Sequence, residues 1–424
     1  MPHLASQEDD ARQFDAKDPL APLRGRFHIP TRTDGTTLVY LAGHSLGLMP
    51  KRVREVIDEE LRDWAEWGVE AHFEGTRPWY SYHERLRETG ARLVGAKPGE
   101  VVCMNSLTVN LHLMMVSFYR PTKSRYKILM EDAAFPSDTY AVKTQLHYHG
   151  LNPKEALLVA KPRRGEDVLR TEDIEELLLR EGEHIALVLF GGVNYVTGQV
   201  FDMARITAVA QRYGCIVGFD LAHAAGNVPL SLHDWNVDFA VWCNYKYLNA
   251  GPGAVASCFI HERHANNPDL PRFAGWWGNH PATRFQMHLQ LEFIPQPGAD
   301  GWQISNPPIL SLAPVMVSYQ MFDEVGMAAL RDKSKRLTGY LQLLLDQHLA
   351  DRVIVVTSSD GEARGCQLSL RVRGAPNDLL LKLKVGGVMC DFREPNVLRV
   401  APVPLYNTYH DVWSFVRALQ SCLT

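Results

Sequence analysis

The chain has 424 residues, of which 46% are hydrophobic and 22% charged, and its formal net charge at pH 7 is −4. This length indicates at least two buried cores, and the composition excludes a disordered or fibrous protein. The small net charge excludes a global field that recruits nucleic acid or anionic membrane, and no apolar run reaches the ~18 residues of a membrane helix. We therefore expect a small-molecule partner, no nucleic acid and no membrane.

The seven cysteines are widely scattered and form no CxxC pair. An odd number without paired spacing indicates reduced thiols. The first stretch, MPHLASQEDDARQFDAKD, is acidic and polar, unlike a secretion or import signal. Both features favour a cytoplasmic protein.

The first element along the chain is an amphipathic helix that opens at Pro50 and stops at Gly68. Short apolar runs then alternate with helical patterns as far as about residue 312. The runs are VVCMN, KILME, EALLVA, IALVLF, CIVGFD, DFAVWCN and AVASCFI. Strands without polar alternation, separated by helices, predict an α/β domain whose mostly parallel sheet is covered on both faces.

The order of elements changes after about residue 312. Long helices over 313–349 are followed by strands VIVVT and CQLSLRV, a helix DLLLKLK, strands VMCDF and VLRVAP, and a final helix. This order predicts a smaller α+β domain. We expect an N-terminal arm with part of the small domain over 1–60, a large domain over 61–312 and a C-terminal small domain over 313–424.

Chemically active residue types follow several of the predicted strands. Ligands of open parallel sheets bind at the carboxyl ends of strands, so these positions are informative. Each residue alone also has a plain structural interpretation: a helix N-cap at Asn105-Ser106-Leu107-Thr108, a turn at Phe135 and Asp138, a buried ion pair at Asp220 and a solvated lysine at Lys246.

Together, these positions are the parts of a pyridoxal phosphate site. A helix N-terminus takes the phosphate, an aromatic ring stacks on the pyridine, a carboxylate keeps the ring nitrogen protonated, and a lysine amine forms a Schiff base. Burial also favours the neutral, nucleophilic amine, so Lys246 need not be solvated.

At this point the sequence resembles the kynureninase family. The motifs are YLAGHSLGLMPK (40–51), NSLTVNLH (105–112), FPSD (135–138), GFDLAHAAGNVPL (218–230), CNYKYLNAGPG (243–253), GWWGN (275–279), ISNPPIL (304–310) and LRVAPVPLYN (398–407). The resemblance implies the aspartate-aminotransferase fold, pyridoxal 5'-phosphate as cofactor, and hydrolytic Cβ–Cγ cleavage of kynurenine-type amino acids. It also implies a homodimer with active sites built from both subunits.

The resemblance assigns roles by position. It implies that Lys246 is the Schiff-base lysine, Asp220 the pyridinium partner, Phe135 the stacking ring and Arg399 the clamp for the substrate α-carboxylate. Tyr245 is implied as a cofactor contact and a candidate proton donor to the β-carbon. Further cofactor contacts are implied at Leu107, Thr108, Asp138 and His223, with Trp276 and Asn306 supplied by the neighbouring subunit.

The expected substrate preference rests on the same resemblance. Kynureninases that favour 3-hydroxykynurenine carry a histidine before the PW pair and an asparagine in SNPP. This sequence has His72 and Asn306 there, with Ser45 and Ser305 close by in motif. We expect a preference for the 3-hydroxy substrate, against the alternative that His72 and Asn306 serve only turn and cap roles.

Two positions depart from the family pattern, and several alternatives remain open. His44 stands where asparagine is usual, and Gly191-Gly192 where relatives often carry a hydroxyl residue or proline. A cysteine desulfurase or other aminotransferase-like enzyme shares the layout, although Cys366 and Cys390 lie in strand-like runs. A non-catalytic binding protein of this fold is a further alternative. His261 and His264 lack a third ligand in register, so no metal is expected, and Arg163-Arg164 is interpreted as a solvated loop.

Overall fold

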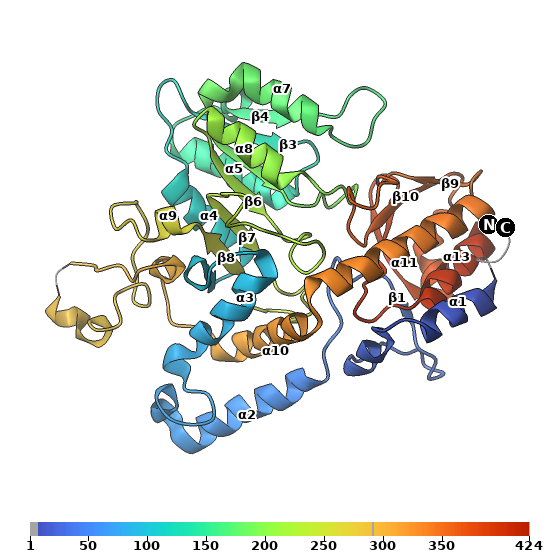
Figure 1. Cartoon of the computed structure of the whole chain (residues 1–424), viewed down its shortest axis with the longest axis horizontal. Coiled ribbons are helices and arrows are strands. Elements are labelled where there is room, and N and C mark those ends of the chain that lie inside the picture. The colour runs from blue at the N-terminus through green and yellow to red at the C-terminus, as the bar shows by residue number, and fades with distance from the viewer. Residues whose placement is uncertain (1–6, 291, 424) are drawn as a thin grey trace.

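The structure is a computed structural model that describes residues 7–290 and 292–423 (Figure 1). Two larger sheets organise it, helices cover both, and a third sheet has only two short strands. The longer helices that do not pack on the smaller of these two larger sheets are α2 (Arg52–Trp67), α3 (Arg87–Val94), α4 (Leu107–Phe118), α5 (Pro136–Tyr148), α7 (Thr171–Glu181), α8 (Met203–Arg212) and α10 (Ile309–Val325). The short helices α6 (Pro153–Ala156) and α9 (Glu262–Ala265) lie between them in the chain. No helix in the described ranges combines the length and apolarity needed to cross a bilayer.

The first sheet has seven strands in the order β2-β8-β7-β6-β5-β3-β4. Their bounds are β2 Val101–Cys103, β3 Lys127–Glu131, β4 Leu157–Ala160, β5 Ile185–Gly191, β6 Ile216–Asp220, β7 Phe239–Trp242 and β8 Ser257–Ile260. β4, β3, β5, β6 and β7 pair in parallel, and β8 is antiparallel to both of its neighbours. The expected mostly parallel α/β sheet is confirmed.

Alternate residues of the central strands enter two different cores. In β5, Leu187 and Leu189 pack in the core that contains α4 and α5, whereas Val188 and Phe190 pack in the core that contains α7, α8 and α10. This arrangement explains the runs without polar alternation, because both faces of the sheet are buried. It also holds the carboxyl ends of the strands rigidly.

The second sheet has four antiparallel strands in the order β12-β13-β10-β9. These are β9 (Val353–Val355), β10 (Leu368–Val372), β12 (Asp391–Arg393) and β13 (Val397–Val400). Helices α1 (Glu8–Ala16), α11 (Met327–His348), α12 (Leu379–Val385) and α13 (Tyr409–Leu423) pack around it. In Figure 1 this α+β region lies to one side of the seven-stranded sheet.

One strand prediction was wrong. The run VMCDF is divided into β11 (Val388–Met389) and β12, which belong to different sheets. β11 pairs in parallel with β1 (Val39–Tyr40), a partner too short to be seen as a strand in the sequence. The N-terminal segment thereby forms a separate two-stranded sheet with the chain that leads into the second sheet.

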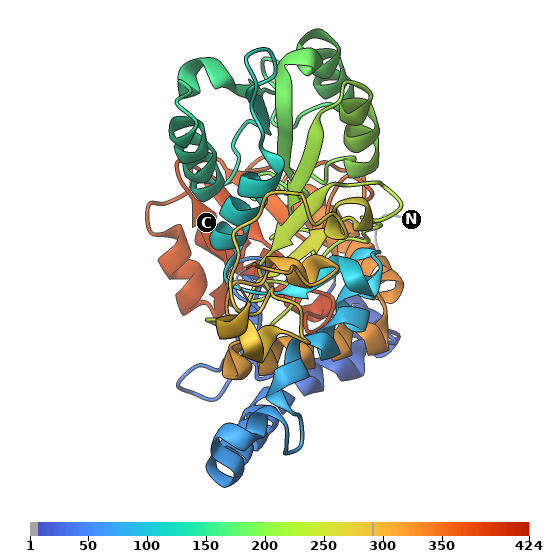
Figure 2. The same ribbon diagram turned by 90° about the vertical axis from the view of Figure 1, so that its left-hand side faces the viewer.

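The division into three parts at residues 60 and 312 stays a prediction. The predicted helix after Pro50 is present as α2, and α10 begins just before residue 312. α10 packs against α2 and α3 and contributes Leu312 and Phe322 to a core shared with the seven-stranded sheet. The hydroxyl of its Tyr319 accepts a hydrogen bond from Nε1 of Trp242 on β7, at 3.1 Å. In Figures 1 and 2, α2 projects as an arm away from the sheets.

Candidate active site

The predicted lysine and aspartate meet at the carboxyl ends of the central strands. Asp220 ends β6 and pairs in register with Gly191, which ends β5. Lys246 follows β7 and is half-buried, and its Nζ lies 3.1 Å from Nε2 of His223. Lys246 is therefore no member of a solvated surface face: it points toward the residues that follow β6.

The turn that carries Lys246 is held by a close backbone contact. The amide of Gly47 donates a hydrogen bond to the carbonyl of Tyr245 at 2.8 Å. A Cβ at Gly47 would come within 2.3 Å of the Lys246 carbonyl oxygen, so only glycine permits this approach. The segment that contains His44 and Ser45 is thereby fixed beside the lysine.

A small cavity opens between the ends of β3, β5 and β6. We call it the strand-end pocket; its lining residues are Glu131, Phe135, Asp138, Gly191, Val193, Tyr195, Asp220, Ala222 and His223. Lys246 borders it, because its Nζ contacts His223 and lies 5.6 Å from the centroid of the Phe135 ring. The Phe135 ring meets Tyr195 edge to face at 5.2 Å.

Three buried carboxyl groups face this pocket. Oδ1 of Asp220 accepts a hydrogen bond from the amide of Ala222 at 2.7 Å, but Oδ1 of Asp138 and Oε2 of Glu131 have no hydrogen-bond partner among the described residues. Burial and the neighbouring Asp220 raise the pKa of Asp138 well above its ordinary value. Within the described ranges, no lysine or arginine forms an ion pair with these three groups. A cationic nitrogen on a bound group would complement them.

The histidine beside Lys246 is kept neutral. Burial, followed by the positive charge of Lys246, holds the pKa of His223 well below its ordinary value. His223 can therefore accept a hydrogen bond through Nε2. Burial also raises the pKa of the Tyr245 phenol, which keeps its proton at neutral pH.

The predicted phosphate contacts lie at the first turn of two helices. Leu107 and Thr108 begin α4, and Oγ1 of Thr108 lies 3.0 Å from Oγ of Ser137 in the first turn of α5. First-turn amides have no partner within their own helix, and a phosphate is a suitable acceptor for them. Together with the pocket carboxyl groups and the Lys246 amine, these first-turn amides fit pyridoxal phosphate.

Arg399 lies opposite Asp391, since β12 and β13 pair these two residues in register. The Arg399 side chain is 1% exposed; its Nη2 binds Asp391, and its Nη1 donates to the Tyr195 carbonyl at 2.8 Å. Its Nε has no partner among the described residues. A buried guanidinium whose Nε–H still lacks an acceptor suits an anionic substrate group.

His44, one of the two departures from the family pattern, lies beside the ion pair of Arg399 and Asp391. His44 is fully buried, and its Nε2 lies 3.7 Å from Oδ2 of Asp391. Burial lowers the pKa of His44 to about 4, so the ring is neutral near pH 7. Burial opposes ionisation of Asp391, but His44 and Arg399 outweigh it and lower the pKa of Asp391 to about 2.

The predicted ring-facing residues lie in a second cavity. We call it the aromatic pocket; its lining residues are His72, Trp79, Trp277, Asn306, Pro307, Pro308 and Ile309. Nδ1 of His72 lies 2.9 Å from the Val69 carbonyl, and its ring packs edge-on against Trp79 at 5.5 Å. The two pockets share no lining residue.

Within one chain, the remaining predicted residues do not join the strand-end pocket. Trp276 is 38% exposed and packs edge-on against Trp277 and Phe285. Ser305 is exposed next to Asn306, and Ser45 is exposed in the segment fixed by Gly47. The single chain thus places Lys246 beside the strand-end pocket. It does not bring His72, Trp276, Ser305 or Asn306 there.

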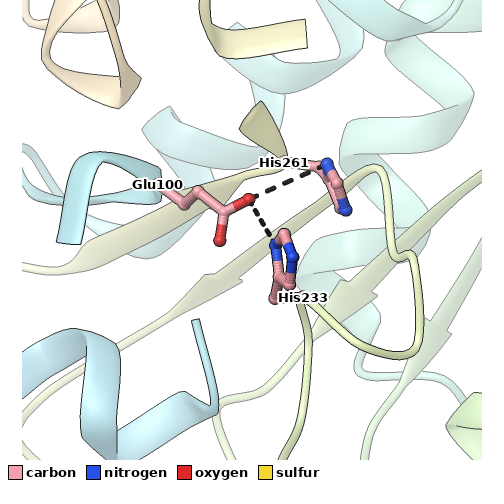
Figure 3. Close-up of side chains that lie close together, drawn as sticks. All are labelled: Glu100, His233 and His261. Carbon is pink, nitrogen blue, oxygen red and sulfur yellow. Dashed lines mark hydrogen bonds and ion pairs between the residues drawn. The ribbon is translucent and has the colours of Figure 1, made fainter. Parts of the chain in front are cut away.

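The histidines considered for metal binding belong to two separate clusters. Nε2 of His264 lies 2.6 Å from Oδ1 of Asp238. His261 instead stacks on His233 at 4.8 Å with an interplanar angle of 19°, and both rings turn Nδ1 toward Glu100 (Figure 3). Oε1 of Glu100 also accepts a hydrogen bond from the Glu262 amide at 2.8 Å, so this oxygen is already paired within the protein. We interpret this cluster as a hydrogen-bonded link between segments.

Two further expectations concern cysteine and arginine. Burial raises the pKa of Cys366 to about 12 and that of Cys390 to about 12, which opposes the reactive thiolate that a desulfurase needs. Arg163 forms a two-pronged ion pair with Asp173 on the exposed surface, in agreement with a solvated loop.

Sequence reasoning missed three residues of the site: Glu131, Tyr195 and Asp391. Glu131 ends the apolar run KILME, so the rule that singled out Asp220 also applies to it. Tyr195 carried no signal, because its contribution includes a backbone carbonyl. Asp391 is recognisable only once its pairing with Arg399 is known.

The fold is that of pyridoxal-phosphate-dependent transferases. It is similar to the cysteine desulfurase CsdA from Escherichia coli, with a TM-score of 0.77 and 18% identity over 95% of this chain and 98% of that chain. It is also similar to the cystine C–S lyase C-DES, with a TM-score of 0.75 and 18% identity over 91% of this chain and 98% of that chain. At this identity the likeness shows the fold alone.

Sequence comparison gives the family. Residues 330–419 match the kynureninase C-terminal domain model. The chain is 58% identical over 413 residues to kynureninase from Myxococcus xanthus, covering 97% of this chain and 96% of that protein. It is 56% identical to kynureninase from Koribacter versatilis, again over 97% of this chain and 96% of that protein. The chain belongs to the kynureninase family, which confirms the resemblance in the motifs.

Proposed function

We propose that this chain is a hydrolase that cleaves the Cβ–Cγ bond of kynurenine-type amino acids, with pyridoxal 5'-phosphate as its cofactor. The observation that carries the proposal is the 58% identity with a kynureninase over 413 residues. The strand-end pocket supports it independently, because its carboxyl groups, its lysine and the adjoining helix N-termini match the needs of that cofactor. Membership of the kynureninase family argues against a cysteine desulfurase and against a non-catalytic binding protein.

The chain's own residues divide the work. Bound pyridoxal phosphate supplies an electron-accepting ring conjugated with the substrate amine. Leu107 and Thr108 would hold the phosphate, Phe135 would stack on the ring, and Asp220 would bind its protonated nitrogen. Asp138 lies beside Asp220 on the same wall of the pocket.

Proton transfers are assigned to Lys246 and Tyr245. Lys246 is positioned to remove the substrate Cα proton, since neutral His223 orients its Nζ from 3.1 Å. Water adds to the γ-ketone and the Cβ–Cγ bond breaks, releasing the aryl carboxylate. Tyr245 keeps its phenolic proton and can deliver it to the β-carbon, after which alanine leaves.

Arg399 is proposed to bind the substrate α-carboxylate. Its guanidinium already neutralises Asp391, and Nε2 of His44 lies 3.7 Å from the same carboxylate oxygen, Oδ2. We therefore propose that His44 supports the orientation of Asp391 and does not contact the substrate directly.

We propose a homodimer in which Trp276 and Asn306 complete the partner's active site. Supporting this, exposed aromatic rings form a connected surface: Phe73 lies 6.1 Å from Phe285, and Phe285 lies 6.1 Å from Trp276. These rings are 55%, 52% and 38% exposed in one chain, respectively. A monomer would leave this apolar surface in water.

We also propose a preference for 3-hydroxykynurenine. His72 and Asn306 line one pocket with Trp79 and Trp277, a combination of apolar walls and two hydrogen-bonding groups. A phenolic hydroxyl that pairs with such groups gains affinity, whereas an unsubstituted ring leaves them unpaired. Ser45 and Ser305 are proposed to lie near the substrate with them.

A cytoplasmic location is proposed from the cysteines. All seven are unpaired, and none needs an oxidising compartment.

The proposed activity is tested by incubating the purified protein with cofactor and kynurenine. We expect anthranilate and alanine in equal amounts, and products other than these would contradict the assignment.

A further inference from the structure

Glu131 occupies a position that the proposed mechanism does not use. It is the last residue of β3 and is 4% exposed, next to the strand end that carries Gly191. Its Oε1 accepts a hydrogen bond from the Gly191 amide at 3.0 Å, while Oε2 is buried without a partner among the described residues. One oxygen is thus committed to the backbone, and the other belongs to the strand-end pocket.

Charged groups face Glu131 from each element around the pocket. Asp138 comes from α5 and Asp220 from the end of β6, while Lys246 follows β7 with its amine directed to His223. Arg399 also contacts Tyr195 of the pocket, but its charge is paired with Asp391. Three ionised carboxylates around one cavity would therefore repel one another with little compensation. Burial of a charge without a partner is costly, and neutralisation removes that cost.

We propose that Glu131 is a positioning residue of the strand-end pocket: as a neutral acid it anchors Gly191 and leaves Asp220 as the negative charge available to the cofactor ring nitrogen. This inference rests on the proposed function, which assigns that role to Asp220. The proton resides on Oε2, because Oε1 accepts from the Gly191 amide. A neutral acid in this place keeps the wall of the pocket fixed without competing with Asp220 for the cationic ring.

The space around Gly191 supports this arrangement. A Cβ at this position would lie 3.0 Å from Oε1 of Glu131, closer than an ordinary contact. Gly191 has no positive φ, so its backbone does not itself require glycine. The absence of a side chain at residue 191 therefore leaves room for the Glu131 carboxyl group.

The electrostatic environment points the same way. Burial, with a contribution from Asp220, raises the pKa of Glu131 from its ordinary value of 4.5 to about 7. A raised folded-state pKa for an acid means that the folded protein holds the proton more tightly than the unfolded chain. The stabilisation is complete below about pH 4.5 and is lost as pH rises toward 7.

The first test uses thermal unfolding of the cofactor-free protein, which does not depend on activity. Glu131→Gln places a permanently neutral group of the same shape at the site. Its Tm relative to wild type should rise steadily from pH 5 to pH 7.5, because only wild type loses the stabilising proton on residue 131 in that window. Glu183→Gln, a change at an exposed residue, should show no such trend. A flat difference for Glu131→Gln would overturn the proposal.

The second test separates a neutral role from a charged one in the complete enzyme. Glu131→Ala leaves the Gly191 amide without its acceptor and should lower kcat/KM, whereas Glu131→Gln should recover at least about tenfold over the alanine variant. Failure of glutamine to recover activity would show that the negative charge itself is required. If the protein cleaved no kynurenine, the proposed function would fail, while the unfolding test would still decide the state of Glu131.

Discussion

The strand-end pocket and the aromatic pocket differ in how fully one chain builds them. The first is formed by the rigid ends of β3, β5 and β6, and its polar groups are buried. The second lies on 3-10 and loop segments and the first residue of α10, with exposed aromatic side chains next to it. In the proposed dimer, one chain would provide the groups for proton transfer and cofactor binding, whereas recognition of the substrate ring would use loops of a second copy.

The largest effect is expected inside the strand-end pocket. Lys246→Ala removes both the cofactor attachment and the proposed base, so kcat should fall by at least about 10³-fold while the fold is retained. The visible absorption of the lysine-bound cofactor should disappear. The control Lys143→Ala, at an exposed position on α5, should keep both properties. A Lys246→Ala enzyme with substantial turnover would contradict the assignment.

A smaller loss is expected at the neighbouring acid. Asp220→Asn keeps the shape but removes the charge that holds a proton on the cofactor nitrogen, so kcat should fall by about 10²-fold or more. Equilibrium titration should still detect bound cofactor. Turnover close to that of wild type would rule out this role for Asp220.

These residues were predictable because a charge at the end of a fully buried strand needs an explanation. The position of Asp220 after CIVGF and of Lys246 after DFAVWCN carries that signal locally. Glu131 carries the same signal, but its importance depends on β3 lying beside β5 and β6. That order arises from pairings between distant segments, which local periodicity does not encode.

Other parts of the structure had weaker signals. VMCDF looked like one strand because its apolar pattern is continuous, yet Cys390 separates two segments that pair with different partners. The Asp391–Arg399 pair depends on the register of β12 and β13, which the sequence alone leaves open. The proposed contact between two copies of the chain leaves even less local trace in the sequence.

The aromatic surface should control assembly. Phe73→Asp places a charge among Phe285 and Tyr80 and should shift the protein from dimer toward monomer in sedimentation, with activity reduced by about tenfold or more. Tyr148→Asp, at a residue that is 79% exposed at the end of α5, should remain dimeric. A fully active monomer at assay concentration would refute the shared-site proposal.

The smallest effect concerns the choice of substrate ring. Wild type should show a higher kcat/KM for 3-hydroxykynurenine than for kynurenine, by about fivefold or more for one satisfied hydrogen bond. Replacing His72 by Trp together with Asn306 by Thr should narrow or reverse this ratio. An unchanged ratio in the double variant would place the specificity elsewhere.

Subunit mixing tests most directly whether the two pockets combine across a dimer. One preparation carries Lys246→Ala and the other carries Trp276→Ala with Asn306→Ala; each alone should be nearly inactive. If each site combines Lys246 of one chain with Trp276 and Asn306 of the other, a mixed dimer contains one intact site. After denaturation and refolding as an equal mixture, activity should recover to about one quarter of wild type, because about half of the dimers are mixed. No recovery, with mixed dimers demonstrated by mass, would contradict the account.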